Sequence, residues 1–77
     1  MKEIVEFKRT QAEKDKMYRE MRNMVGYNVE VKFFDKQINR MTIDRGRVIL
    51  KNKIYWVATN ETNRLIGSNL IVEYKVI

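Results

Sequence analysis

The chain has no cysteine, no histidine and no proline, and only three of its 77 residues are glycine. Without cysteine or histidine it has no thiolate nucleophile, no imidazole base, no Ser-His-Asp triad and no zinc finger. Most familiar enzyme classes are therefore excluded, and we expect no catalytic residues, no metal site and no cofactor. A domain of this length without a disulfide or a structural metal depends on apolar packing or on a partner chain. A homodimer is therefore one alternative.

Long apolar runs are also missing. Residues 1–7 include Glu3 and Glu6 where a signal peptide has an uninterrupted apolar core, and no later stretch approaches the ~20 apolar residues of a membrane span. We therefore expect a cytoplasmic protein that does not bind membranes. No stretch is of low complexity or rich in glycine and serine, so residues 1–77 are expected to form a single domain.

Positive charge, in contrast, is in excess. The chain has 16 Lys and Arg against 10 Asp and Glu, which gives a formal net charge of +6. Most of this excess lies in residues 36–53, which include six basic residues and one acidic residue. An anionic partner would be attracted most strongly to this stretch.

One helix is predicted near the amino terminus. Thr10 and Glu13 match a capping box, which places the first helical residue at Gln11, and Gly26 is suited to end the helix after Val25. Apolar residues recur at spacings of three and four, at Met17, Tyr18, Met21, Met24 and Val25. The opposite side carries a secondary basic face of Lys16, Arg19 and Arg22. Such a face contacts phosphates or an acidic protein, or is simply solvated.

The rest of the chain is predicted to form a meander of strands. Alternation of apolar residues indicates strands at 27–34, 38–44, 47–51, 54–59 and 70–77. Two-residue turns are expected at Arg45-Gly46 and Asn52-Lys53. Residues 60–69 are expected to be a loop with one helical turn around 64–66, and residues 4–7 fit a short strand or an arm.

These elements predict an α+β fold. We expect one N-terminal amphipathic helix packed on a curled antiparallel sheet of four to five strands. A helix followed by such a meander resembles, in outline, the small barrels of the Sm-like and SH3-like kind. If both turns contain two residues, one face of the meander holds Met41, Ile43, Val48, Leu50, Tyr55 and Val57, the expected core. The reverse face then holds Arg40, Thr42, Asp44, Arg47, Ile49, Lys51, Ile54, Trp56 and Ala58.

Basic groups interleaved with an indole favour nucleic-acid binding. Arginine and lysine neutralise phosphates, while Trp56 offers a surface on which an unpaired base can stack. We therefore expect a small non-enzymatic regulatory protein that binds single-stranded RNA or DNA, with RNA slightly favoured. The candidate contacts are Lys36, Arg40, Arg45, Arg47, Lys51, Lys53 and Trp56.

Other interpretations of the same residues remain open. Trp56 also fits a position under the helix, as part of the core, or a position in an interface with a second copy or a protein partner. The same basic surface also fits an inhibitor or toxin-neutralising protein, of the kind that phages and mobile elements encode, that docks on an acidic protein. Asp15, Asp35 and Asp44 lie on different predicted elements, so the sequence indicates no paired-carboxylate or two-metal site.

Overall fold

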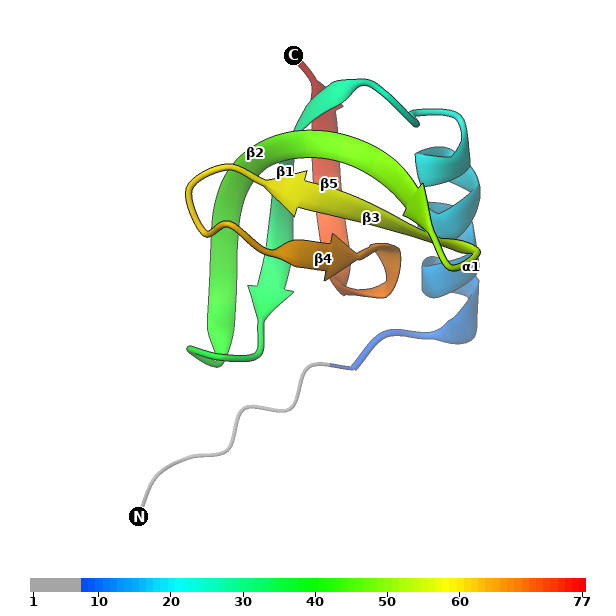
Figure 1. Cartoon of the computed structure of the whole chain (residues 1–77). Coiled ribbons are helices and arrows are strands. Elements are labelled where there is room, and N and C mark those ends of the chain that lie inside the picture. The colour runs from blue at the N-terminus through cyan, green and yellow to red at the C-terminus, as the bar shows by residue number, and fades with distance from the viewer. Residues whose placement is uncertain (1–7) are drawn as a thin grey trace.

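The computed structural model describes residues 8–77 (Figure 1). In chain order the elements are α1 (Gln11–Arg22), β1 (Asn28–Asp35), β2 (Arg40–Lys51), β3 (Ile54–Thr59), β4 (Leu65–Gly67), the 3-10 helix η1 (Ser68–Leu70) and β5 (Ile71–Val76). The strands form one antiparallel sheet in the order β4-β3-β2-β1-β5, so β4 and β5 are the edges of an open sheet. The predicted α+β fold is confirmed. The strand or arm expected at residues 4–7 lies outside the described residues.

The capping box sets the start of α1. The Glu13 backbone N–H donates to the Thr10 hydroxyl at 3.1 Å, and the Thr10 backbone N–H donates to the Glu13 carboxylate at 3.1 Å. The helix ends at Arg22, three residues before the predicted end, and the chain turns through Gly26 with φ of +90°. The helix therefore buries a narrower stripe than expected, consisting of Met17 and Met21.

The core lies between α1 and one face of the sheet, which we call the inner face. Met17 and Met21 belong there to one cluster with buried residues of the sheet, and α1 contacts β3 and η1. The buried apolar residues of this core are Met17, Met21, Val29, Val31, Phe33, Val48, Val57, Ile66 and Ile71. The opposite side of the sheet, which we call the outer face, is therefore the one that α1 does not cover.

Strand β2 differs most from the prediction. It runs without a break and arches across the molecule, pairing first with β1 and then with β3 (Figure 1). The turn predicted at Arg45-Gly46 is therefore wrong. Gly46 instead allows a close backbone approach, because a Cβ atom at this position would lie 2.1 Å from the carbonyl oxygen of Ala58. Gly46, which suggested a chain reversal, therefore allows the backbones of β2 and β3 to pack closely.

The missing turn changes which residues face the core. Side chains alternate along an unbroken strand, so Met41 and Ile43 point to the outer face, whereas Val48 points to the inner face. They are 38% and 62% exposed, and their predicted place in the core is wrong. The turn at Asn52-Lys53 is confirmed, since Leu50 pairs with Tyr55 and Val48 pairs with Val57. Leu50, although on the inner side, is 54% exposed near the end of its strand.

The stretch predicted as a loop contains a strand. Residues 65–67 form β4, which pairs with β3, and residues 68–70 form η1. A helical turn around residues 64–66 is therefore wrong. A strand of three residues is too short to produce an alternating pattern that distinguishes it from a loop.

Two buried carboxylates hold the loops of the sheet. Asp44 accepts hydrogen bonds from the Thr62 hydroxyl and from the backbone N–H groups of Arg45, Glu61 and Thr62. Asp35 accepts two hydrogen bonds from the guanidinium of Arg64. The Arg64 hydrogen bonds lower the pKa of Asp35, against a smaller opposing effect of burial. Burial by itself raises the pKa of Asp44, but its hydrogen bonds together lower it below the ordinary value.

These lowered pKa values predict acid destabilisation. A carboxylate whose pKa is lower when folded stabilises the fold above the unfolded pKa, and this contribution is lost as the pH falls through the folded pKa. We expect the urea midpoint, followed by circular dichroism, to fall below about pH 4 and to change little between about pH 5 and 8, where histidine would titrate. Asp44→Asn should reduce the acid dependence while lowering stability at neutral pH. A midpoint that is constant down to about pH 2.5 would contradict the role of these carboxylates.

Candidate nucleic-acid interface

The outer face of β2, β3 and β4 gathers apolar and cationic side chains. Arg47 pairs with Ala58, Ile49 with Trp56, and Lys51 with Ile54. Across the next ladder, Ala58 pairs with Leu65 and Trp56 with Gly67. Directly opposed residues of antiparallel strands project to the same side, so these side chains share one surface. We call it the Trp56 face; it consists of Arg47, Ile49, Lys51, Ile54, Trp56, Ala58 and Leu65.

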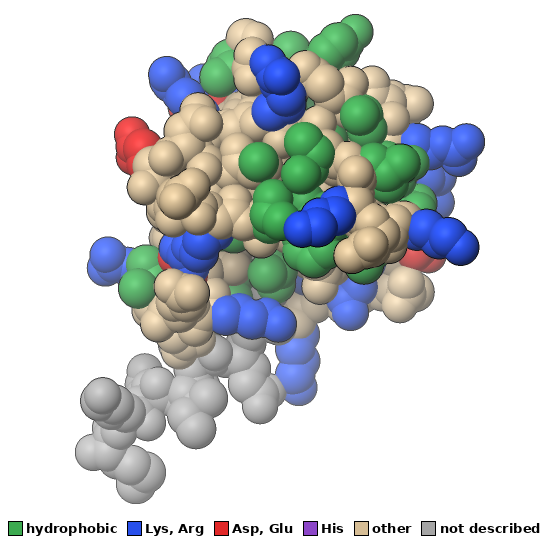
Figure 2. Space-filling model, in the orientation of Figure 1, with side chains coloured by type: hydrophobic (Ala, Val, Ile, Leu, Met, Phe, Trp, Pro, Cys, Tyr) green, Lys and Arg blue, Asp and Glu red, His purple; other side chains and the backbone are tan. Residues whose placement is uncertain are grey.

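Much of the Trp56 face is accessible to solvent. Ile54 is 42% exposed and Leu65 is 40% exposed, while Arg47 and Lys51 are also exposed. Figure 2 shows hydrophobic side chains gathered over β3 and its neighbouring strands, with Lys and Arg side chains among and around them. An exposed apolar patch interleaved with cations is a typical feature of a binding surface.

The positive charge of this face is not compensated locally. No acidic residue occurs between Asp44 and Glu61 in the sequence. Within residues 8–77, no ion pair involves Arg47, Lys51 or Lys53. These cations therefore remain available to an anionic ligand.

Trp56 is held along the sheet at both ends of its indole. Its Nε1–H donates to the carbonyl oxygen of Lys51 at 3.0 Å. At the other end, Cζ3 lies 3.5 Å from the position that a Cβ atom on Gly67 would occupy. The indole is half-buried by these neighbours and lies outside the core cluster. Because α1 packs on the inner face, the interpretation that placed Trp56 under the helix does not hold.

The structure brings together four of the seven predicted contact residues. Arg47, Lys51 and Trp56 lie on the Trp56 face, and Lys53 lies in the turn that joins β2 to β3. The hydroxyl of Tyr18 donates to the carbonyl oxygen of Lys53 at 3.3 Å, which links this turn to α1. The four residues therefore form a compact group around one hairpin.

The other three predicted residues do not join this group, two because of their position and one because it is ion-paired. Lys36 and Arg40 flank the β1–β2 turn, at the opposite end of β2 from Lys51. Arg45 forms an ion pair with Glu30 at 3.3 Å. The single basic track expected through all seven residues therefore does not form, because the absence of a turn at residues 45–46 extends β2 and carries its first residues away.

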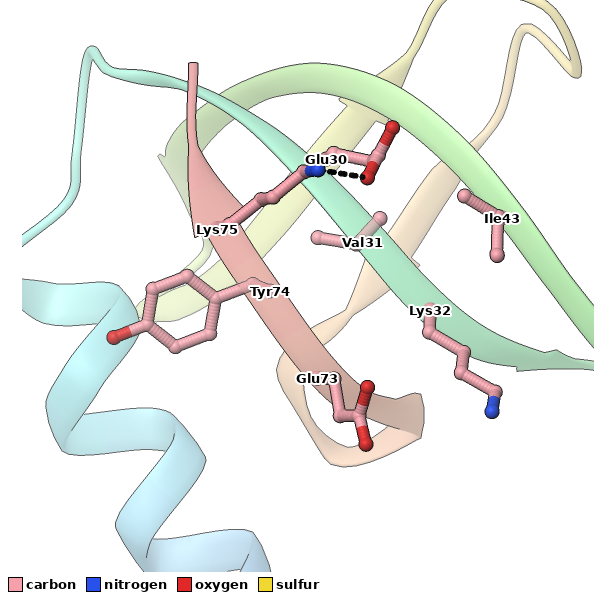
Figure 3. A pocket seen from close by; sticks show the side chains of 7 residues that line it. All are labelled: Glu30, Val31, Lys32, Ile43, Glu73, Tyr74 and Lys75. Atoms are coloured by element: carbon pink, nitrogen blue, oxygen red, sulfur yellow. Dashed lines mark ion pairs between the residues drawn. The ribbon is translucent and has the colours of Figure 1, made fainter.

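The outer face of β1 and β5 has balanced charges. Glu30 contacts Arg45 and also Lys75, whose Nζ lies 3.2 Å from its carboxylate, and these contacts lower the pKa of Glu30 (Figure 3). Next to them Lys32 pairs with Glu73 across the strands. A cavity of about 250 Å³ is lined by both carboxylates, by Lys32 and Lys75, and by Ile43. Since its cations are matched by carboxylates, this part of the sheet is unsuited to an anion.

The secondary basic face lies on another side of the domain. Lys16, Arg19 and Arg22 are exposed on α1, and none forms an ion pair with another described residue. Since α1 packs on the inner face of the sheet, these cations and the Trp56 face point away from each other. One strand of nucleic acid would have to pass around the domain to contact both.

The contribution of β4 to this face was not predicted from the sequence. Leu65 extends the apolar part of the Trp56 face, and Gly67 leaves the space over which the indole lies. Both residues were placed in a loop, and no local pattern distinguishes them from loop residues. Their role follows only from the pairing of β3 with β4.

Three further observations bear on function. Among the described residues, no three Asp or Glu side chains are placed to hold a metal ion. No helix in the described part of the chain is long and apolar enough to cross a membrane. Comparison with protein-family models, with curated proteins and with solved structures gives no match for this chain.

Proposed function

We propose that this protein binds single-stranded nucleic acid through the Trp56 face, as a non-enzymatic regulatory protein. The observation that carries the proposal is the fixed indole of Trp56 beside the unpaired cations Arg47, Lys51 and Lys53. A rigid aromatic surface next to uncompensated positive charge matches the two chemical features of an unpaired strand, which are flat bases and regularly spaced phosphates.

Each part of the face has a separate task in this proposal. One base stacks on Trp56, which contributes about 1–3 kcal/mol, while the exposed aliphatic groups of Ile54 and Leu65 contact neighbouring bases or sugars. Arg47, Lys51 and Lys53 neutralise phosphates and release counterions. A duplex is a poor ligand because its bases are already stacked and paired.

RNA is favoured over DNA as the ligand. Recognition of RNA is directed mainly at unpaired bases in loops, bulges and ends, where stacking on aromatic side chains is common. This ligand implies that the protein acts in the cytoplasm, where unpaired RNA is abundant. Binding there would sequester the strand or block access to it.

Trp56→Ala tests the stacking step. We expect this variant to bind a fluorescein-labelled oligouridylate about tenfold to a hundredfold more weakly by fluorescence anisotropy, since it loses one base-stacking contact. Trp56→Phe should keep most of the affinity. The matched control is Tyr27→Ala, which removes an aromatic side chain that is 54% exposed and lies outside the Trp56 face. Unchanged affinity in a folded Trp56→Ala variant would overturn the proposal.

The exposed apolar residues of the same face favour a second candidate function. Ile54 and Leu65, together with Trp56 and Arg47, resemble the centre of a protein interface, where tryptophan and arginine are enriched. The alternative is thus an inhibitor or toxin-neutralising protein that docks this surface on an acidic protein. Such a partner would copurify in fixed stoichiometry after nuclease treatment, whereas a nucleic-acid complex would not survive the nuclease.

A homodimer through this face is the third alternative. Two copies would bring Arg47 and Lys51 of one chain close to those of the other, which is unfavourable for like charges. Light scattering at increasing protein concentration distinguishes this alternative from the other two.

A further inference from the structure

A second group of cations surrounds a cavity of about 320 Å³ away from the balanced face of β1 and β5. The described residues that line it come from separate parts of the chain. They are Lys8 and Arg9 before α1, Lys14 in α1, Lys36 in the β1–β2 turn, and Asn69 and Leu70 in η1. None of these lining residues is acidic. The fold therefore brings Lys36 to one concave site with three basic residues from the start of the described chain.

Arg9 is fixed beside this cavity. Its side chain is only 9% exposed, and one guanidinium nitrogen donates to the carbonyl oxygen of Ile71. Another of its nitrogens lies 3.7 Å from the carboxylate of Glu13, which also accepts hydrogen bonds from Thr10. Glu13 is thus shared between Arg9 and the helix cap.

Lys36 is placed by a turn that one buried carboxylate holds in position. It follows Asp35, whose carboxylate binds Arg64 and accepts the backbone N–H of Gln37 at 2.9 Å. Lys14 approaches from the helix, where it is half-buried. Within residues 8–77, neither lysine forms an ion pair. Two lysines on different elements therefore line one cavity, and neither has an ion-pair partner among the described residues.

We propose that this cavity is a phosphate-binding site. Gathering like charges in a concave site costs energy that a multiply charged anion relieves. Lysine ammonium groups donate three hydrogen bonds each and are common phosphate ligands, and the side-chain amide of Asn69 supplies a further donor. The chemistry selects a compact oxyanion with two or more charges, such as a phosphate or pyrophosphate group.

Asn69 connects this site to the Trp56 face. A Cβ atom on Gly67 would lie 2.7 Å from the Asn69 Oδ1 atom and 3.5 Å from Cζ3 of Trp56, so both side chains flank the same glycine. The phosphate is therefore either a free anion or a phosphate of a strand that also contacts Trp56. The site itself does not depend on the function proposed for the Trp56 face.

Titration with inorganic pyrophosphate at constant ionic strength tests the site. We expect saturable amide chemical-shift changes at Arg9, Lys14, Lys36 and Asn69 in ¹H–¹⁵N spectra. The Lys14→Gln/Lys36→Gln double variant should bind at least tenfold more weakly. The matched control, Lys16→Gln/Lys32→Gln, removes the same charge from residues that do not line the cavity, and it should change the affinity less than about twofold.

The possible results distinguish the phosphate site from nucleic-acid binding by the Trp56 face. Equal weakening in both double variants, or no saturable binding of pyrophosphate, would overturn the phosphate site. If Lys14→Gln/Lys36→Gln also weakens oligouridylate binding, the phosphate belongs to the strand; if that affinity is unchanged, the ligand is a free anion. If oligouridylate binding depends on Trp56 but pyrophosphate does not bind, the proposed function of the Trp56 face stands and the phosphate site is overturned.

Discussion

Replacing Gly46 by alanine is expected to lower the free energy of unfolding by about 3 kcal/mol or more. The added Cβ atom would lie 2.1 Å from the carbonyl oxygen of Ala58 and 2.7 Å from its carbonyl carbon. Both are backbone atoms of β3, so they cannot move aside without separating β3 from β2. A domain of this size has a total stability of about 4–12 kcal/mol, and the loss is a large share of it.

Urea unfolding followed by circular dichroism measures this effect. The control is Gly26→Ala, because Gly26 has φ of +90° but no atom within 4 Å of its added Cβ. Its cost is that of backbone strain alone, about 1 kcal/mol. If Gly46→Ala had a stability within about 0.5 kcal/mol of the unmodified chain, the close approach of β2 and β3 would be wrong.

Reversing two charges on the Trp56 face should weaken nucleic-acid binding more than any other change there. We expect Arg47→Glu/Lys51→Glu to lower the affinity for oligouridylate by about a hundredfold or more at low salt, because two phosphate contacts become repulsive. Both residues are exposed and, in the described part of the chain, form no ion pair. The fold should therefore survive the change, with a thermal unfolding curve close to that of the unmodified protein.

Lys16→Glu/Arg19→Glu is the matched control for this experiment. It changes the net charge by the same amount on the exposed side of α1, away from the Trp56 face. A long-range effect of net charge is screened at moderate salt, so the affinity should fall less than about fivefold. Equal losses in the two double variants would show that the protein attracts polyanions through its overall charge, without a defined site.

Local signals in the sequence predicted the helix and one hairpin. The capping box of Thr10 and Glu13 requires only neighbouring residues, and the turn at Asn52-Lys53 joins adjacent strands. The glycine at position 46 is ambiguous, because glycine serves both for a reversal and for close backbone contact. With a two-residue turn at 45–46, Ile43 would lie opposite Val48 and on the same face. In a continuous strand these two residues point to opposite faces, so the predicted turn put Met41 and Ile43 on the wrong face.

The part of the candidate site that depends on the β2–β3 hairpin was predictable from the sequence. Ile49, Lys51 and Trp56 share a face through the local register of β2 and β3, which was expected correctly. Lys36 and Arg40 were assigned to the same surface only through the wrong turn. The contact between Trp56 and Gly67, and the approach of Lys36 to Lys14, join residues distant in sequence, and no local pattern predicts such contacts.

The fluorescence of Trp56 provides the most direct measurement of the central claim, because it is the only tryptophan in the chain. Oligouridylate is titrated at about 50 mM and about 200 mM salt while indole emission and the anisotropy of the labelled strand are recorded together. We predict saturable quenching at low salt, with an affinity about twentyfold lower at high salt, as expected for three phosphate contacts to a single strand. Binding seen by anisotropy without a change in indole emission, or no binding at either salt concentration, would contradict the account.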